Sequence, residues 1–153
     1  MSDTPSKNYF TTGQMRNALI QIEDQMVHSN WMPNVILGIN RGGCIPGVYL
    51  SHGLKLPHKV IDLQLRDGTN IPDSNSVKNL KINSKKILII DDINDTGSTF
   101  IHLNRIINAN NTKKYFACLI NNIGSKFQVE FYGRSINKVE KPSWYVFPWE
   151  IES

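Results

Sequence analysis

Residues 87–99 read ILIIDDINDTGST. Four aliphatic residues run directly into Asp91 and Asp92, and the small, hydroxylated stretch DTGST follows at residues 95–99. Two like charges side by side cost free energy when both are desolvated. The pattern predicts a buried strand that ends in an acidic pair, followed by a loop with little side-chain bulk.

Strand and helix patterns alternate on both sides of this stretch. Alternation of this kind predicts one α/β domain over residues 1–153, built around a mostly parallel central sheet flanked by helices. The polar residues 66–84 are expected to form a long loop, and loops of that length are commonly functional. The expected strands are 35–40, 59–65, 86–90 and 115–120, and the expected helices are one capped at Thr11-Thr12, 45–53 and 98–109.

The composition excludes several classes of protein. With 153 residues and 40% hydrophobic content, the chain is sized for one core. It has no apolar run long enough to span a bilayer, and its amino terminus lacks the apolar core of a secretion signal, so no membrane partner is expected. Cys44 and Cys118 form no CxxC or Cys/His cluster, which predicts a reduced, cytoplasmic protein without a zinc site.

The charge pattern points to a small anionic ligand more than to a nucleic acid. The formal net charge is +4, but the lysines and arginines are scattered, with pairs at Lys85-Lys86 and Lys113-Lys114. A nucleic-acid site needs a contiguous basic stripe, often with aromatic residues between the charges. We therefore expect no nucleic-acid partner.

The end of strand 86–90 has the chemistry of a site for a phosphorylated sugar. Ligands of open parallel sheets bind beyond the carboxyl ends of the strands. Consecutive backbone N–H groups of residues 95–99, together with the positive end of the following helix, favour a phosphate. Asp91 and Asp92 can accept hydrogen bonds from vicinal hydroxyls. A phosphate next to a cis-diol describes a ribose 5-phosphate.

Three other interpretations were weighed. A haloacid-dehalogenase-type phosphatase needs a second acid two residues after its nucleophile, where this chain has Ile93 and Asn94. A Walker-type nucleotide loop needs Gly-Lys-Ser/Thr, which this sequence lacks. The structural alternative is a helix N-cap after a solvated acidic turn, and it fits a lone DTGST better than it fits the whole stretch.

The thirteen residues resemble the phosphoribosyl-pyrophosphate (PRPP) signature of type I phosphoribosyltransferases. The resemblance implies that Asp91 and Asp92 orient the ribose hydroxyls and a Mg²⁺ ion. It also implies that Asp95 contacts N7 of the base and manages its proton, which makes it the candidate catalytic residue. The residues implied to bind PRPP in this segment are Asp91, Asp92, Asp95, Thr96, Gly97, Ser98 and Thr99.

Two further segments resemble the same family. After strand 35–40, Arg41, Gly42 and Gly43 match the short loop that binds the pyrophosphate, and in relatives the peptide just before the first glycine is often cis. The stretch after Leu65, opened by Arg66, matches a loop that closes over PRPP and excludes water.

The tail SWYVFPWE (143–150) resembles the carboxyl-terminal hood of the 6-oxopurine enzymes, the xanthine-guanine and hypoxanthine-guanine phosphoribosyltransferases. The hood is expected from about residue 128 to 153. The resemblance implies that Trp144 stacks on the base, that Tyr145 contacts it through the backbone, and that Glu150 positions its amino edge or supports the hood. The structural alternative is that these aromatic residues fill the core.

One position departs from the family pattern. Asn122 stands where purine enzymes of this group carry a lysine that donates to the 6-oxo group, so Asn122 is the expected base contact here. The leading hypothesis is a Mg²⁺-dependent purine-salvage transferase, expected to form a homodimer or homotetramer. A transferase for another base, and a PRPP-sensing regulator that binds RNA or DNA, stay open as alternatives.

Overall fold

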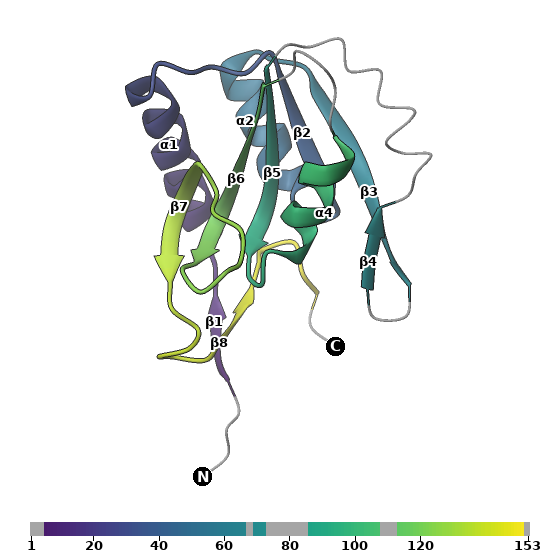
Figure 1. Ribbon diagram of the computed structural model, residues 1–153. Helices are drawn as coiled ribbons and strands as arrows, with labels where there is room; N and C mark the ends of the chain where they lie inside the picture. The colour runs from purple at the N-terminus through teal and green to yellow at the C-terminus, as the bar shows by residue number, and fades with distance from the viewer. Residues whose placement is uncertain (1–4, 67–68, 73–85, 108–112, 152–153) are drawn as a thin grey trace.

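The central sheet has six strands in the order β4-β3-β2-β5-β6-β7 (Figure 1). The computed structural model describes residues 5–66, 69–72, 86–107 and 113–151. Five strands of this sheet run parallel, and β4 joins its edge antiparallel to β3. These strands are β2 (Val35–Asn40), β3 (His58–Arg66), β4 (Thr69–Pro72), β5 (Lys86–Asn94), β6 (Lys113–Asn122) and β7 (Phe131–Ile136).

Helices cover both faces of the sheet (Figure 1). Along β5, Leu88 and Ile90 pack in the cluster that contains α1 (Thr12–His28) and α2 (Cys44–Leu54). Ile87 and Ile89 point to the opposite face and pack with α4 (Ser98–Ile106). Because both faces are covered, a parallel strand here is apolar along its whole buried length. The predicted α/β fold class is confirmed.

Side chains close the ends of two helices. Thr11 and Gln14 form a reciprocal capping box at the start of α1: the Gln14 amide donates to Thr11 Oγ1 at 3.1 Å and the Thr11 amide donates to Gln14 Oε1 at 2.8 Å. At the far end of α4, Lys114 Nζ donates to the carbonyls of Asn104 and Ile107. Lys114 therefore stabilises a helix carboxyl terminus, where a cation is favoured.

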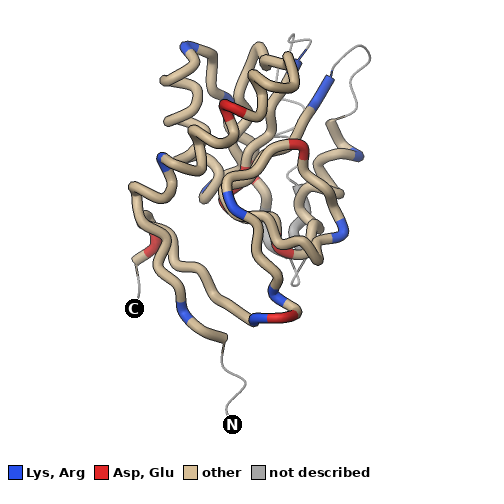
Figure 2. The backbone as a smooth tube through the Cα atoms, turned by 90° about the vertical axis from the view of Figure 1, so that its left-hand side faces the viewer, with Lys and Arg blue, Asp and Glu red and all other residues tan. Residues whose placement is uncertain are grey.

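A second, two-stranded sheet lies at the carboxyl end of the central one. It pairs β1 (Ser6–Tyr9) with β8 (Ser143–Val146) in parallel, and both project from the main body in Figures 1 and 2. Residues 131–136, which the sequence analysis included in the hood, form the edge strand β7 of the central sheet. In the described residues, the separate part of the tail therefore begins after β7.

Of the predicted bounds that differ from the structure, two bear on the site. The strand expected at 86–90 continues through the acidic pair to Asn94, because it stays paired with β6 as far as Asn94 and Asn121. The expected loop at 66–84 contains β4, which extends the β3 edge as a hairpin. Residues 67–68 and 73–84 of that stretch lie outside the described residues. Among the described helices, none combines the length and hydropathy needed to cross a membrane.

Candidate active site

The site lies where the order of the parallel strands reverses. β2 has β3 on one side and β5 on the other, and the helices that follow β2 and β5 cover opposite faces of the sheet. The two loops that leave these strands therefore diverge and open a crevice between them. Such a switch point is the general ligand site of open α/β sheets.

Two cavities occupy this crevice. One, of about 240 Å³, is lined by residues 91–100, which include both aspartates of the pair and the DTGST loop. The other, of about 450 Å³, extends toward β2 and β3. The two cavities adjoin, because Asp91 and Thr99 line both of them. The larger one is lined by Ile39, Asn40, Arg41, Asp62, Leu63, Asp91 and Thr99.

The DTGST loop has the backbone of an anion cradle. Gly97 has a φ of 94°, in the left-handed region that favours glycine. A Cβ at this position would also lie 2.7 Å from the amide nitrogen of Phe127. The hydroxyls of Thr96 and Ser98 are 3.1 Å apart, and the Ser98 amide donates to Thr96 Oγ1 at 3.3 Å. The Thr96 and Ser98 hydroxyls and the Ser98 amide thus lie together at the start of α4, where a phosphate is favoured.

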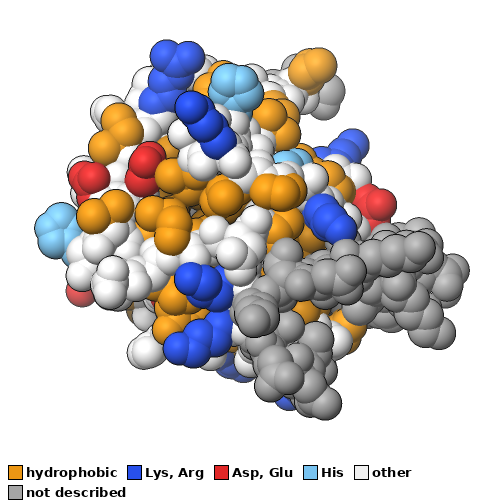
Figure 3. Space-filling model, turned by 90° about the horizontal axis from the view of Figure 1, so that it is seen from above, with side chains coloured by type: hydrophobic (Ala, Val, Ile, Leu, Met, Phe, Trp, Pro, Cys, Tyr) orange, Lys and Arg blue, Asp and Glu red, His pale blue; other side chains and the backbone are white. Residues whose placement is uncertain are grey.

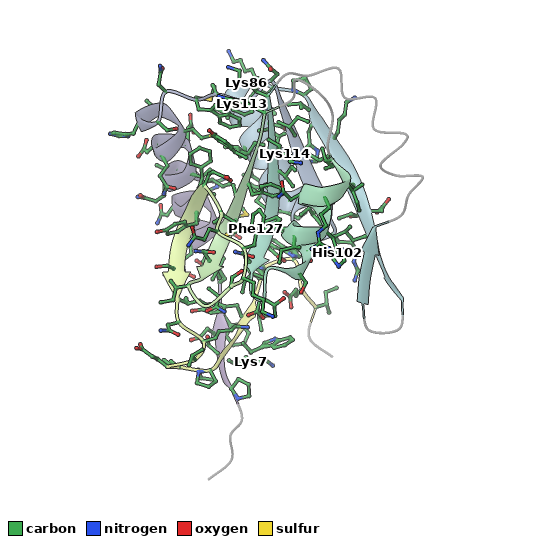
Figure 4. The ribbon with its side chains drawn as sticks, in the orientation of Figure 1. Lys7, Lys86, His102, Lys113, Lys114 and Phe127 are labelled. Atoms are coloured by element: carbon green, nitrogen blue, oxygen red, sulfur yellow. The ribbon has the colours of Figure 1, made fainter. Side chains whose placement is uncertain are left out.

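The segment after β6 holds this loop in place. The amide of Lys126 donates to the Thr96 carbonyl at 3.0 Å, and Asn94 Nδ2 donates to the Phe127 carbonyl at 2.8 Å. The Phe127 ring packs against Phe100 of α4, with centroids 5.5 Å apart (Figure 4). Residues Lys126 and Phe127 therefore hold the cradle in place by hydrogen bonds and by an aromatic contact.

The acidic pair is half-buried and lies against the cavities, not in open solvent. The Asp92 amide donates to Asp91 Oδ1 at 2.8 Å, and the Ile93 amide donates to Asp92 Oδ1 at 2.7 Å. Burial, followed by the charge of Asp92, raises the pKa of Asp91 well above its usual range. Burial also raises the pKa of Asp92, and the nearby Glu150 carboxylate contributes. Desolvated carboxylates of this kind favour a ligand that brings positive charge or hydroxyl donors.

The loop after β2 is pressed against the acidic pair. A Cβ on Gly42 would lie 2.0 Å from Asp92 Oδ2, and one on Gly43 would lie 2.3 Å from the Ile90 carbonyl oxygen. Arg41 is exposed and lines the larger cavity. The cis peptide bond joins Asn40 to Arg41, one bond earlier than the resemblance implied. The structure thus brings Arg41, Gly42 and Gly43 beside the acids.

Asn40 and Asp62 also line the larger cavity, and sequence reasoning did not single them out. Asn40 Nδ2 donates to Asp62 Oδ1 across the β2–β3 pair. The signal was available in principle, since both are polar residues toward the carboxyl ends of neighbouring parallel strands.

Asp95 is linked to two other segments of the chain. Lys138, in the turn between β7 and β8, pairs with it at 2.8 Å between Nζ and Oδ2. Asn122 is buried: its Nδ2 donates to the Asp95 carbonyl at 3.0 Å, and its Oδ1 accepts from the Lys138 amide at 3.2 Å. Nothing in the sequence pattern pointed to Lys138.

The aromatic residues of the tail divide into two groups. Phe147 is buried and stacks on Trp149, with ring centroids 4.9 Å apart and planes at 9°. Phe147 and Trp149 therefore pack in the core, as in the alternative in which the aromatic residues of the tail fill the core. Trp144 is 58% exposed and remains available for stacking on a ligand, whereas Tyr145 is half-buried.

Two other predicted site residues complete the set. Glu150 Oε1 accepts from the Phe147 amide at 3.4 Å, which ties the acid to the turn of the hood. The backbone of Arg66 ends β3, while its side chain lies outside the described part of the structure.

The comparisons with known proteins agree with this geometry. The model of the phosphoribosyl transferase domain matches residues 6–153. A purine phosphoribosyltransferase from Pyrococcus horikoshii is 28% identical, with a TM-score of 0.74 over 97% of this chain and 96% of that one.

Two solved structures at lower identity share the fold. A xanthine-guanine-hypoxanthine phosphoribosyltransferase from Helicobacter pylori is 18% identical (TM-score 0.79; 97% of this chain, 95% of that one). A hypothetical protein from Neisseria gonorrhoeae with bound ppGpp is 15% identical (TM-score 0.73; 98% and 92%). The resemblance drawn from residues 87–99 is confirmed: this chain belongs to the phosphoribosyl transferase family of enzymes.

Proposed function

We propose that this enzyme transfers the 5-phosphoribosyl group of PRPP to a 6-oxopurine (xanthine, guanine or hypoxanthine). The products are pyrophosphate and a nucleoside 5′-monophosphate, as in purine salvage. The observation that carries the proposal is the pair of adjoining cavities, with the anion cradle and Asp92 in one, Arg41 in the other and Asp91 at their junction. The purine phosphoribosyltransferase from P. horikoshii, similar over nearly its whole length, supports a purine as the base.

Each part of PRPP has a complementary group in the site. The 5-phosphate binds the amides and hydroxyls of residues 96–99 at the start of α4. The pyrophosphate lies in the larger cavity against Arg41 and the Gly42-Gly43 backbone, where a guanidinium suits a diphosphate. Asp91 and Asp92 face the ribose hydroxyls, and their charge stabilises the positive charge that develops on the ribose ring.

The donors at the acidic pair also suit Mg²⁺, which this family generally uses. Mg²⁺ is a hard cation that takes one or two carboxylates and keeps water and substrate oxygens as its other ligands. Asp91 and Asp92 supply two such carboxylates, and the described residues hold no cluster of three acidic, histidine or cysteine ligands. Bound there, the ion would neutralise charge on the leaving pyrophosphate.

In the reaction, N9 of the base forms a bond to C1′ of the ribose as the bond from C1′ to the pyrophosphate oxygen breaks. The electron pair of the broken bond leaves with the pyrophosphate. Asp95 accepts the proton that the base loses, at N7, and passes it to solvent. Trp144 stacks on the purine ring and holds it in the plane required for attack.

The two alternatives predict different basic surfaces and different substrates. A nucleic-acid-binding regulator needs a contiguous basic face. On the face drawn in Figure 3, lysine and arginine side chains stand in separate groups. The labelled Lys86, Lys113 and Lys114 lie at the end of the sheet where strands begin, away from the site (Figure 4). The non-purine alternative is tested directly by assaying turnover with different bases as substrates.

The decisive experiment measures pyrophosphate release from PRPP and Mg²⁺ with hypoxanthine, guanine, xanthine, adenine, orotate and uracil in turn. We expect turnover with at least one 6-oxopurine. Turnover confined to orotate or uracil would establish the non-purine alternative. PRPP binding without turnover of any base would favour the regulator.

A further inference from the structure

Asn122 does not present an unengaged amide to a base. Its side chain is 8% exposed, its Nδ2 donates to the Asp95 carbonyl, and its Oδ1 accepts from the backbone of Lys138 and Gly124. These bonds join the start of the phosphate loop, at Asp95, to the turn after β7. Asn122 therefore ties the backbone of Lys138 to the backbone of Asp95.

Lys138 places a cation beside the Asp95 carboxylate. Its ammonium lies 2.8 Å from Asp95 Oδ2, and its side chain is 24% exposed compared with 44% for Asp95. Asp95 lines the cradle cavity. The Lys138 backbone amide donates to the Asn122 side-chain oxygen, so the backbone of the lysine is tied to the same residue that holds the Asp95 carbonyl.

The pair matches one edge of a 6-oxopurine. The O6 and N7 atoms of guanine are adjacent: O6 is an acceptor that a lysine can bind, and in the reacting base N7 carries the proton that Asp95 accepts, whereas adenine presents an amino donor at C6. We propose that Lys138 is the specificity-determining cation of the base site: it donates to O6 while Asp95 interacts at N7. This assignment rests on the proposed function, because it names how the same site selects its base.

The ion pair also makes a clean target for substitution. Partly exposed ion pairs contribute little to folding stability, so loss of the Lys138 charge should leave the melting temperature nearly unchanged. Lys141 is an exposed lysine in the same turn and provides a matched control for loss of positive charge.

The test is calorimetric binding of guanosine, inosine and adenosine 5′-monophosphates to wild type, Lys138→Met, Lys138→Arg and Lys141→Met, with PRPP affinity and turnover measured beside it. We expect the wild type to prefer the 6-oxo nucleotides. Lys138→Met should weaken their binding by about 10- to 100-fold, the worth of a hydrogen bond to a charged group. Adenosine monophosphate and PRPP affinities should stay unchanged, Lys138→Arg should keep part of the preference, and Lys141→Met should match wild type.

Each contrary result has a separate meaning. A preference for 6-oxo nucleotides that survives in Lys138→Met, or is absent from the wild type, overturns the assignment even if purines are turned over. Equal loss of all three nucleotides and of PRPP also overturns it, since that is the effect of a displaced loop. A Lys138-dependent preference in an enzyme that turns over no purine supports the assignment while refuting the proposed function.

Discussion

Asp95 stands where three segments meet: the end of β5, the end of β6 and the turn after β7. Its carboxylate lines the cradle cavity, and its backbone carbonyl is held by Asn122. A residue fixed at both its backbone and its side chain is well placed to exchange a proton with a base bound in one orientation. The bond from Asn122 thus fixes the backbone of Asp95, while the ion pair with Lys138 sets the charge around its carboxylate.

We expect Asp95→Asn to lower kcat by about 10²–10⁴, the usual contribution of a general acid–base group. The amide keeps the size of the side chain but cannot accept the proton. Steady-state kinetics with the preferred base measures the effect, with Asp24→Asn on α1 as the control for loss of one exposed acid. An Asp95→Asn variant that keeps most of its turnover would remove Asp95 from the catalytic role.

At the scale of elements, the site depends on two strand ends that approach each other closely. The loop after β2 and the acidic end of β5 are in contact through Gly42 and Asp92, where even a methyl group has no room. The proposed pyrophosphate and ribose sites are therefore in direct packing contact.

Gly42→Ala should displace the Asp92 carboxylate, because the new Cβ would lie 2.0 Å from Oδ2. A displacement of about 1 Å at a reacting centre costs on the order of 10²-fold, so we expect PRPP affinity or kcat/KM to fall by about that factor. Isothermal titration with PRPP and Mg²⁺ measures it directly.

Gly53→Ala in α2 is the matched control. A Cβ at Gly53 meets nothing within 4 Å, and alanine in a helix is favoured by about 0.5–1 kcal/mol over glycine. This variant should be slightly more stable, with PRPP affinity unchanged. Unchanged PRPP affinity in Gly42→Ala as well would show that the contact with Asp92 is unimportant for binding.

At the scale of the whole molecule, the small β1–β8 sheet lies beyond the carboxyl ends of the central strands, where Figures 1 and 2 show it projecting from the main body. The Lys138–Asp95 pair and the proximity of Glu150 to Asp92 connect the tail with the site. The central sheet thus carries the groups proposed to bind PRPP, and the tail carries the exposed Trp144 proposed for the base.

Trp144→Ala should raise the KM for the base by about 5- to 150-fold, since stacking of a base on an aromatic side chain is worth about 1–3 kcal/mol. The KM for PRPP and the melting temperature should change little, because Trp144 is 58% exposed. Trp149→Ala, by contrast, should lower the melting temperature, as its ring stacks on the buried Phe147. An unchanged KM for the base in Trp144→Ala would rule out the stacking role.

The sequence predicted the elements whose signals are local. The bounds of β2 agree with the predicted strand 35–40, and Thr11 caps α1 as expected, because periodicity and capping depend on residues a few positions apart. The strands β1, β4, β7 and β8 were missed, and each lies at an edge of its sheet. β1 forms only by pairing with β8, across most of the chain.

By itself, the sequence determined the mostly parallel sheet, through the alternation of strand and helix patterns. It also predicted a phosphate-binding loop after the central strand, because the paired acids and the glycine-containing loop lie within thirteen residues. Only the tertiary structure decided which cation stands beside Asp95. Lys138 lies 43 positions away in the chain, and it reaches Asp95 because β7 pairs with β6 and the turn after β7 is tied to Asn122. A contact made through strand pairing at that separation leaves no periodic signal along the chain.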